Sequence, residues 1–285
     1  MFATHLTLPA PAKLNLMLHI LGRRQDGYHE LQTLFQFLDY CDELTFVAQE
    51  TNEIRLEQSL AGVAPSQNLV YRAAKLLQEH CRIGTGVTIT LKKRIPMGAG
   101  LGGGSSNAAT TLVGLNQLWG AGLSLNELAE LGLQLGADVP VFVHGCASWA
   151  EGVGERLIRV DLPQPWYLVI NPACHVSTGQ IFSHKELTRN TPAITIATAL
   201  EHGGKNDCES VVSALYPEVK TALNWLGKFA TARITGTGAS LFASFDSQHE
   251  AEQVLKQSPA GLTGFVAQGL NLSPLHREAK IRTVL

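Results

Sequence analysis

The sequence predicts a mixed α and β protein made of two domains. Short segments rich in β-branched residues, such as 87–91, alternate between apolar and polar positions as strands do. Longer segments, such as 105–119, repeat apolar residues at three- and four-residue spacing, which is typical of helices. The length of 285 residues exceeds the usual size of one domain, and Pro163 and Pro165 indicate a join near residue 160. The two expected domains are 1–160 and 161–285.

The expected N-terminal domain contains strands and helices in succession. Its expected strands, which are short and either apolar or alternating, are 13–20, 28–38, 43–48, 87–91 and 141–143. Its expected helices are 68–81, 105–119 and 124–135. Asn68 can cap the first helix, and Ser105 or Ser106 can cap the second. Ser124 and Glu127 have the spacing of a capping box and are expected to open the third helix.

The expected C-terminal domain is a small α+β unit. We expect a strand at 166–170, a strand-turn-strand segment at 232–245, and helices at 208–215, 219–229 and 249–257. Residues 184–205 carry no motif that indicates a function.

The composition is that of an ordinary globular protein, with 45% hydrophobic and 16% charged residues, so a disordered chain is excluded. The 22 basic and 24 acidic residues are scattered, which argues against nucleic acid as a partner. Five widely spaced cysteines without a C-x-x-C motif favour reduced thiols over disulfides or a zinc site. The sequence shows neither a secretory leader nor an apolar segment of membrane-spanning length, so we expect a cytoplasmic protein without a membrane partner.

A glycine-rich loop precedes the helix expected at 105–119. It consists of Pro96, Met97, Gly98, Ala99, Gly100, Leu101, Gly102, Gly103, Gly104, Ser105 and Ser106. So many glycines predict backbone conformations that a Cβ would forbid and a close approach of N–H groups to a ligand. The following helix would direct its free N–H groups and positive dipole end toward the loop, so we expect a phosphate group to bind here. A flexible turn is the simpler alternative, but a turn rarely needs this many glycines.

The class of phosphate loop is not decided by the glycines themselves. Gly98, Gly100 and Gly103 satisfy the G-x-G-x-x-G spacing of dinucleotide-binding folds, which by itself is a weak signal. Pro96 and Met97 interrupt the approach from the strand, and the loop does not open a βαβ unit. The sequence lacks the Walker motif and the H-R-D and D-F-G motifs of protein kinases. A dinucleotide oxidoreductase and a nucleotide-binding protein without catalysis remain alternatives at this point.

Two further segments accompany the loop 96–106, namely 11–16 (PAKLNL) and 235–240 (TGTGAS). In their order and spacing, the three segments together resemble the GHMP family of small-molecule kinases. Further segments are similar to family members that phosphorylate a cytidine diphosphate-linked methylerythritol; these are 26–33 (DGYHELQT), 136–140 (GADVP) and 271–277 (NLSPLHR). The similarity extends over essentially the whole chain.

The resemblance implies an α+β fold with two domains. The N-terminal α/β domain would carry the glycine-rich phosphate loop, and the C-terminal domain would be a ferredoxin-like α+β unit. It also implies ATP-dependent phosphorylation of the substrate's 2-hydroxyl group in the non-mevalonate pathway of isoprenoid biosynthesis. Mg²⁺ is expected with ATP, through ligands that the sequence does not identify, and the protein is expected to be a monomer or homodimer. The main alternative is a kinase of this family that acts on a different alcohol or sugar.

The resemblance further implies the roles of single residues. Asp138 would accept the proton of the attacking hydroxyl group, and Lys13 would face the carboxylate and orient it. By position alone, Asp138 would be a turn aspartate and Lys13 a surface lysine. The implied substrate-binding residues are Asn15, Tyr28, His29, Thr178 and Phe182.

The cytidine part would be held by Tyr28, His29 and Phe182, which would distinguish this substrate from other alcohols. Phe35 is expected in the core instead. The segment 235–240 would by itself be a turn between strands, and in the resembling kinases it closes on the phosphate site from the second domain.

Overall fold

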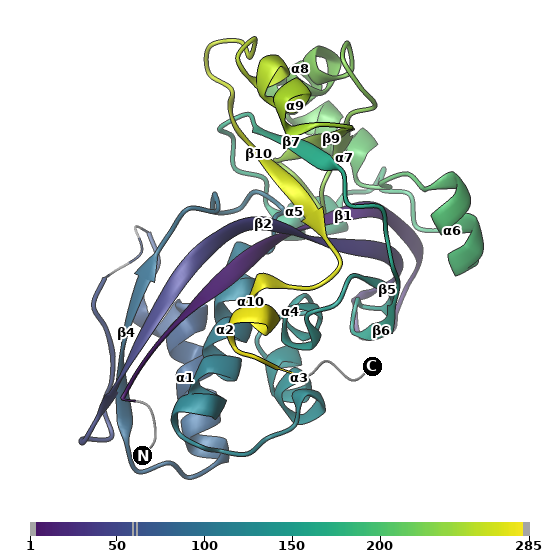
Figure 1. Cartoon of the computed structure of the whole chain (residues 1–285). Helices are drawn as coiled ribbons and strands as arrows, with labels where there is room; N and C mark the ends of the chain where they lie inside the picture. The colour runs from purple at the N-terminus through teal and green to yellow at the C-terminus, as the bar shows by residue number, and fades with distance from the viewer. Residues whose placement is uncertain (1–3, 59, 61, 282–285) are drawn as a thin grey trace.

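The chain folds around a long curved sheet, with helices α1 to α4 on one side and a smaller group of strands and helices on the other (Figure 1). The structure, a computed structural model, describes residues 4–58, 60 and 62–281. Within this part of the chain, no helix is long and apolar enough to cross a membrane.

The first elements of the chain form the larger group. They are β1 (His5–Arg23), β2 (His29–Gln49), β3 (Ile54–Leu56), α1 (Leu69–His80), β4 (Gly86–Lys92), α2 (Gly103–Leu118), α3 (Leu125–Leu133), α4 (Val139–His144), β5 (Ser148–Gly152) and β6 (Arg156–Arg159). A short 3₁₀ helix precedes α1 at Pro65–Gln67. The remaining elements are β7 (Trp166–Asn171), α5 (Thr178–Ser183), α6 (Ile196–His202), α7 (Glu209–Leu215), α8 (Pro217–Leu226), β8 (Arg233–Ile234), β9 (Leu241–Phe245), α9 (Gln248–Leu255), β10 (Thr263–Leu270) and α10 (Pro274–Glu278).

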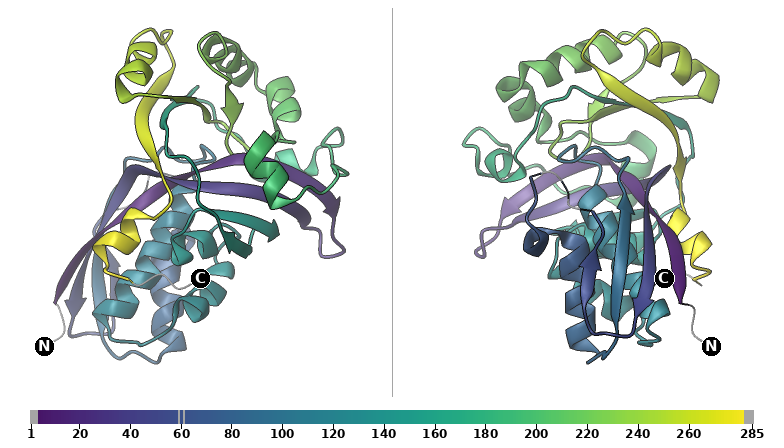
Figure 2. Two further views of the ribbon diagram at one scale, coloured as in Figure 1. Left: turned by 45° about the vertical axis from the view of Figure 1, so that its right-hand side comes forward. Right: turned by 90° about the vertical axis from the view of Figure 1, so that its left-hand side faces the viewer.

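Strands β1 and β2 form a long antiparallel hairpin that lies between the helices α1 to α4 and the second group of elements (Figures 1 and 2). It pairs His5 with Val47 at one end and Arg23 with His29 at the other. β4, β5 and β10 also pair with β2, so this strand connects both groups of elements. The two strands expected at 28–38 and 43–48 are therefore one strand, because the polar segment between them is paired within the sheet.

The helices of the first group begin where local signals predict. The Asn68 side chain accepts a hydrogen bond from the Val70 N–H at 2.9 Å and caps α1. At α3, Ser124 and Glu127 form both hydrogen bonds of the capping box. These helices enclose a core with the inner face of the sheet, and its large buried side chains include Phe37, Phe46, Leu77 and Phe142.

Two expectations about this region are wrong. Residues 141–143 belong to the helix α4 and not to a strand, because a three-residue apolar run has no periodicity that separates the two. Pro140 in the first turn and Gly145 in the left-handed conformation mark the ends of this helix. In addition, α2 begins at Gly103 with Gly102 as its N-cap, so neither Ser105 nor Ser106 caps it.

In the second group, β7 pairs with β9 and β10 while α7, α8 and α9 cover a second core (Figure 2). The strands and helices expected between 166 and 257 are confirmed to within a few residues. Leu18 and Ile20 of β1 are buried in this second core, and Leu275 of α10 is buried in the first. Near residue 160, the chain passes from β6 to β7, and this remains our proposed domain boundary.

Candidate active site

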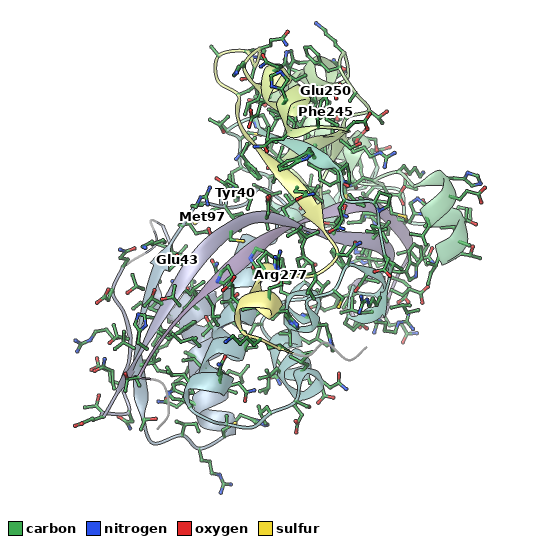
Figure 3. All side chains as sticks on the ribbon, viewed as in Figure 1. Tyr40, Glu43, Met97, Phe245, Glu250 and Arg277 are labelled. Atoms are coloured by element: carbon green, nitrogen blue, oxygen red, sulfur yellow. The ribbon has the colours of Figure 1, made fainter. Side chains whose placement is uncertain are left out.

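A cavity of about 580 Å³ lies beside the glycine loop, a size suited to small-molecule ligands. It brings together residues from both ends of the chain. The expected site residues on its wall are Lys13, Asn15, the loop residues from Pro96 to Ser105, Asp138, Thr178 and Phe182. Met97, labelled in Figure 3, is 53% exposed. Neither Tyr28 nor His29 lines this cavity.

The glycine loop adopts conformations that its sequence requires. Gly98, Gly100 and Gly102 have φ angles of 65°, 73° and 71°, in the left-handed region that other residues rarely adopt. Because Gly102 is the N-cap of α2, the start of this 16-residue helix has no side-chain cap. Its uncapped N–H groups and the helix dipole make this end of the cavity favourable for an anion.

The loop is held by the other two motifs of the resemblance. The Lys13 N–H donates to the Leu101 carbonyl at 3.0 Å, and the Ser240 N–H donates to the Ala99 carbonyl at 3.1 Å. The Thr235 hydroxyl donates to the Gly100 carbonyl at 3.3 Å. Segments 11–16, 96–106 and 235–240 therefore meet at one place.

Lys13 and Asp138 form an ion pair at the centre of this site. Their Nζ and Oδ2 atoms are 3.2 Å apart, and the exposed side-chain fractions are 3% for Lys13 and 33% for Asp138. The Lys13 ammonium also donates to the Gly100 carbonyl at 3.0 Å and to the Asn15 Oδ1 atom. Phe35, a core residue as expected, places its ring 5.5 Å from the Lys13 Nζ atom. A cation with this many contacts is well fixed relative to the loop.

Asp138 occupies the N-cap position of α4, but its side chain makes no capping hydrogen bond. Asp138 therefore does not act as a helix cap, which is the ordinary role of an aspartate at this position. Its carboxylate lies on the cavity wall beside the Lys13 ammonium, where a ligand can reach it.

The backbone of β1 is irregular around Lys13 and Asn15. Register shifts relative to β2 occur between Pro11 and Lys13 and between Asn15 and Met17. Such irregularities redirect side chains and are common next to active sites. They interrupt the regular alternation of the strand where Lys13 and Asn15 reach the cavity.

Two threonines that sequence reasoning missed hold Asn15. The Thr235 hydroxyl accepts a hydrogen bond from the Asn15 N–H at 2.9 Å, and the Thr33 hydroxyl accepts one from Asn15 Nδ2 at 2.8 Å. Thr33 in turn donates to the Met17 carbonyl at 2.6 Å. Both threonines lie within segments that carry the resemblance, and this was the only available signal.

Two of the residues expected to bind cytidine, His29 and Phe182, are in contact. The rings of His29 and Phe182 are stacked, with centroids 5.0 Å apart and an angle of 28° between their planes. Tyr28 is 61% exposed, so its phenol ring is accessible to a ligand. Thr178 lies on the cavity wall, and its hydroxyl is 3.0 Å from that of Thr237.

A buried carboxylate, Asp42, supports both ends of the glycine loop. It is fully buried and accepts hydrogen bonds from the N–H groups of Arg94 and Ile95, at 2.7 Å and 2.8 Å, just before the loop. It also accepts one at 2.8 Å from Asn107 Nδ2 on α2 and is paired with the Lys93 ammonium. No motif in the sequence marked this residue, because its partners lie in two distant segments, 93–95 and 107.

Replacing Asp42 with asparagine is expected to lower the free energy of unfolding by about 3 kcal/mol, because it leaves the Lys93 ammonium without its buried partner. The affinity of the site for its anionic ligand should fall as well, since the loop loses its support. The matched control is Glu43→Gln, which breaks the exposed pair of Glu43 with Lys92 and should change stability by less than about 1 kcal/mol. Urea denaturation measures both effects, and equal stability losses in the two variants would contradict the role of Asp42.

The two halves of the chain match the family models for the GHMP kinases N terminal domain, over residues 68–146, and the GHMP kinases C terminal domain, over residues 186–260. The chain belongs to the GHMP kinase family of small-molecule kinases. The α+β fold class implied by the resemblance is thereby confirmed.

Relatives within the family point to one particular kinase. A protein of Tolumonas auensis named 4-diphosphocytidyl-2-C-methyl-D-erythritol kinase is 58% identical over 94% of each chain. A protein of the same name from Pseudomonas aeruginosa is 56% identical over 97% of this chain and 98% of its own. The crystal structure of a 4-(cytidine 5′-diphospho)-2C-methyl-D-erythritol kinase matches with a TM-score of 0.79 and 34% identity, over 93% of this chain and 99% of that one.

Proposed function

We propose that the protein transfers the γ-phosphoryl group of ATP to the 2-hydroxyl group of 4-diphosphocytidyl-2-C-methyl-D-erythritol. This reaction is a step in the non-mevalonate, or methylerythritol phosphate, pathway to isoprenoid precursors. The relatives named for this activity, at 56–58% identity over nearly the full chain, support the substrate. The observation that carries the chemistry is the Lys13–Asp138 ion pair beside the glycine loop.

Asp138 is the base in the proposed reaction. Its carboxylate takes the proton of the 2-hydroxyl group while that oxygen forms a bond to the γ-phosphorus atom. The bond between this phosphorus and the oxygen bridging to ADP breaks, so ADP leaves with the electron pair. Lys13 holds the carboxylate in place and contributes positive charge next to the transferred group.

The glycine loop holds the phosphates of ATP in this proposal. Its left-handed glycines and the uncapped start of α2 offer backbone N–H groups to the anion without a basic side chain. Phosphoryl transfer depends mainly on positioning and charge stabilisation. The loop, the Lys13 ammonium and the Asp138 carboxylate provide both on one cavity wall.

We propose that Mg²⁺ arrives together with ATP. Among the described residues, no group of three or more His, Cys, Asp and Glu side chains could hold a metal ion. Mg²⁺ commonly keeps several waters and binds substrate phosphates through few protein ligands. Asp138 and Ser105 line the cavity, and their side chains carry oxygen atoms, the ligand type that Mg²⁺ prefers. When bound, the metal neutralises phosphate charge.

The substrate's two ends are held by different groups. We propose that the cytosine ring is recognised by Tyr28, His29 and Phe182, where an aromatic stack is already present. Asn15 and Thr178 line the same cavity as Phe182 and the Lys13–Asp138 pair, and we propose them as contacts for the rest of the substrate.

A direct test compares ATP-dependent turnover of 4-diphosphocytidyl-2-C-methyl-D-erythritol with that of cytidine-free methylerythritol. Stacking and one hydrogen bond to the base together favour the cytidine compound by roughly 3 kcal/mol, so kcat/KM should be about 100-fold higher for it. Release of ADP is the measured quantity. Equal turnover of the two alcohols would reject this substrate in favour of a kinase acting on another alcohol or sugar.

A further inference from the structure

Arg189, in the segment without a recognised motif, forms four hydrogen bonds around the His29–Phe182 stack. Its Nε atom donates to His29 Nε2 at 3.1 Å. Its terminal nitrogens donate to the carbonyls of Leu187 at 3.1 Å and of Phe182 and His184, both at 2.8 Å. One half-buried guanidinium therefore contacts both residues of the stack and holds the backbone that follows α5.

These contacts decide the protonation state of the His29 ring. A guanidinium only donates hydrogen bonds and stays charged, so His29 Nε2 must accept and cannot carry a hydrogen. A neutral imidazole with a bare Nε2 carries its hydrogen on Nδ1. Within residues 4–58, 60 and 62–281, His29 Nδ1 makes no hydrogen bond. Only 7% of His29 is exposed, but Nδ1 is not among the fully buried polar atoms without a partner, so this N–H is left for a ligand.

We propose that Arg189 is a positioning residue that holds His29 as the Nδ1–H tautomer and thereby presents a fixed hydrogen-bond donor to the pyrimidine base of the substrate. The inference rests on the proposed function, because it assigns the base to the His29–Phe182 stack. Cytosine has two ring-edge acceptors, O2 and N3, which suit an N–H donor. Without Arg189, the ring could adopt the other tautomer, in which Nδ1 is an acceptor and faces the base with the wrong polarity.

The charges around His29 support a neutral ring. Burial lowers the pKa of His29 most, and the positive charges of Arg189 and of Arg23 on β1 lower it further. The neighbouring carboxylate of Glu30 is paired with Arg24 and Arg156. Removing Arg189 takes away one of the lowering causes, so the pKa of His29 should rise toward its ordinary value.

The tautomer can be measured without substrate, by ¹⁵N NMR of the histidine rings of the whole protein at pH 8. The His29 signals are assigned by their loss in His29→Gln. We expect the Nδ1–H tautomer in the unmodified protein and a shift toward the Nε2–H tautomer in Arg189→Met, which keeps side-chain bulk but has no donor. The unmodified protein is itself decisive: a hydrogen on His29 Nε2 would overturn the proposal, even if Arg189→Met did not fold.

Arg23→Met is the matched control, because it removes the other cation that lowers the pKa of His29. Arg23 makes no hydrogen bond to the imidazole within the described residues, so the tautomer should be unchanged in this variant. A tautomer shift in Arg23→Met equal to that in Arg189→Met would show that charge alone, and not the hydrogen bond to Nε2, sets the ring. That outcome would also overturn the proposal.

Binding of cytidine 5′-diphosphate, followed by calorimetry, tests the consequence for the ligand. At pH 8, Arg189→Met should bind roughly tenfold more weakly than the unmodified protein, the effect of one hydrogen bond. At pH 6, this ratio should shrink, because a protonated His29 ring carries hydrogens on both nitrogens and regains the Nδ1 donor. A purely structural defect would give the same ratio at both pH values and would contradict the role proposed for Arg189.

The two measurements separate the possible failures. If the unmodified protein shows the Nδ1–H tautomer but does not bind cytidine 5′-diphosphate, the assignment of the base to this stack fails with the proposed substrate, while the action of Arg189 on His29 stands. If cytidine 5′-diphosphate binds and the tautomer does not respond to Arg189→Met, the role of Arg189 fails alone.

Discussion

Asp138→Asn should lower kcat by on the order of 10³, the usual contribution of a general base to catalysis. Asparagine has nearly the same shape and can still accept a hydrogen bond from the Lys13 ammonium, which lies 3.2 Å from the carboxylate. It cannot accept the proton of the substrate hydroxyl group. Because the lost interaction is needed mainly in the transition state, the affinity for ATP should change little. Single-turnover transfer of labelled phosphate and calorimetric ATP binding measure the two quantities.

The control for this variant is Asp161→Asn. Asp161 is 79% exposed, and its carboxylate lies 3.7 Å from Arg159 on the surface, away from the cavity wall. The same chemical change there should leave kcat and ATP affinity unaltered. If Asp138→Asn retained a kcat within a few-fold of the unmodified enzyme, Asp138 could not be the base.

Gly100→Ala is expected to weaken ATP binding by roughly 100-fold. A Cβ on Gly100 would lie 2.2 Å from the carbonyl oxygen of Thr235, a backbone atom that cannot rotate away. The φ angle of 73° adds the strain of a left-handed conformation. Left-handed strain of about 1–2 kcal/mol and a similar cost for the steric overlap together give this estimate. The loop would have to move, and with it the carbonyl that accepts a hydrogen bond from Lys13.

Gly122→Ala separates the effect of left-handed backbone strain from that of the steric overlap. Gly122 has a φ angle of 75°, almost that of Gly100, but a Cβ there would meet no atom within 4 Å. This variant should lose stability by about 1 kcal/mol and bind ATP normally. Calorimetry measures the ATP affinity of both variants, and urea denaturation measures their stability. Equal ATP affinity in Gly100→Ala and the unmodified protein would show that the phosphates do not depend on this loop.

Much of the site was predictable because its motifs are local. Glycines of the loop 96–106 adopt left-handed φ angles, as their concentration predicts, and the capping signals at Asn68 and Ser124 place two helices within a residue or two. The roles of Lys13 and Asp138 were implied by a resemblance, and the structure brings these two side chains together. The segment 141–143 was misassigned because three apolar residues fit a buried helix as well as a strand.

The amino-acid sequence by itself determined the glycine-rich loop, the family and the residue types available for catalysis, since these depend on spacing within short segments. Only the tertiary structure decided which distant groups support them. Thr235 is 220 residues from the Asn15 it contacts, and Arg189 is 160 residues from His29. Contacts of this kind follow from the register of β1 on β2 and from the packing of the second group of elements against that hairpin. Local propensity carries no information about either, so Asp42 and Arg189 became visible only in the fold, as did the contact between Thr235 and Asn15.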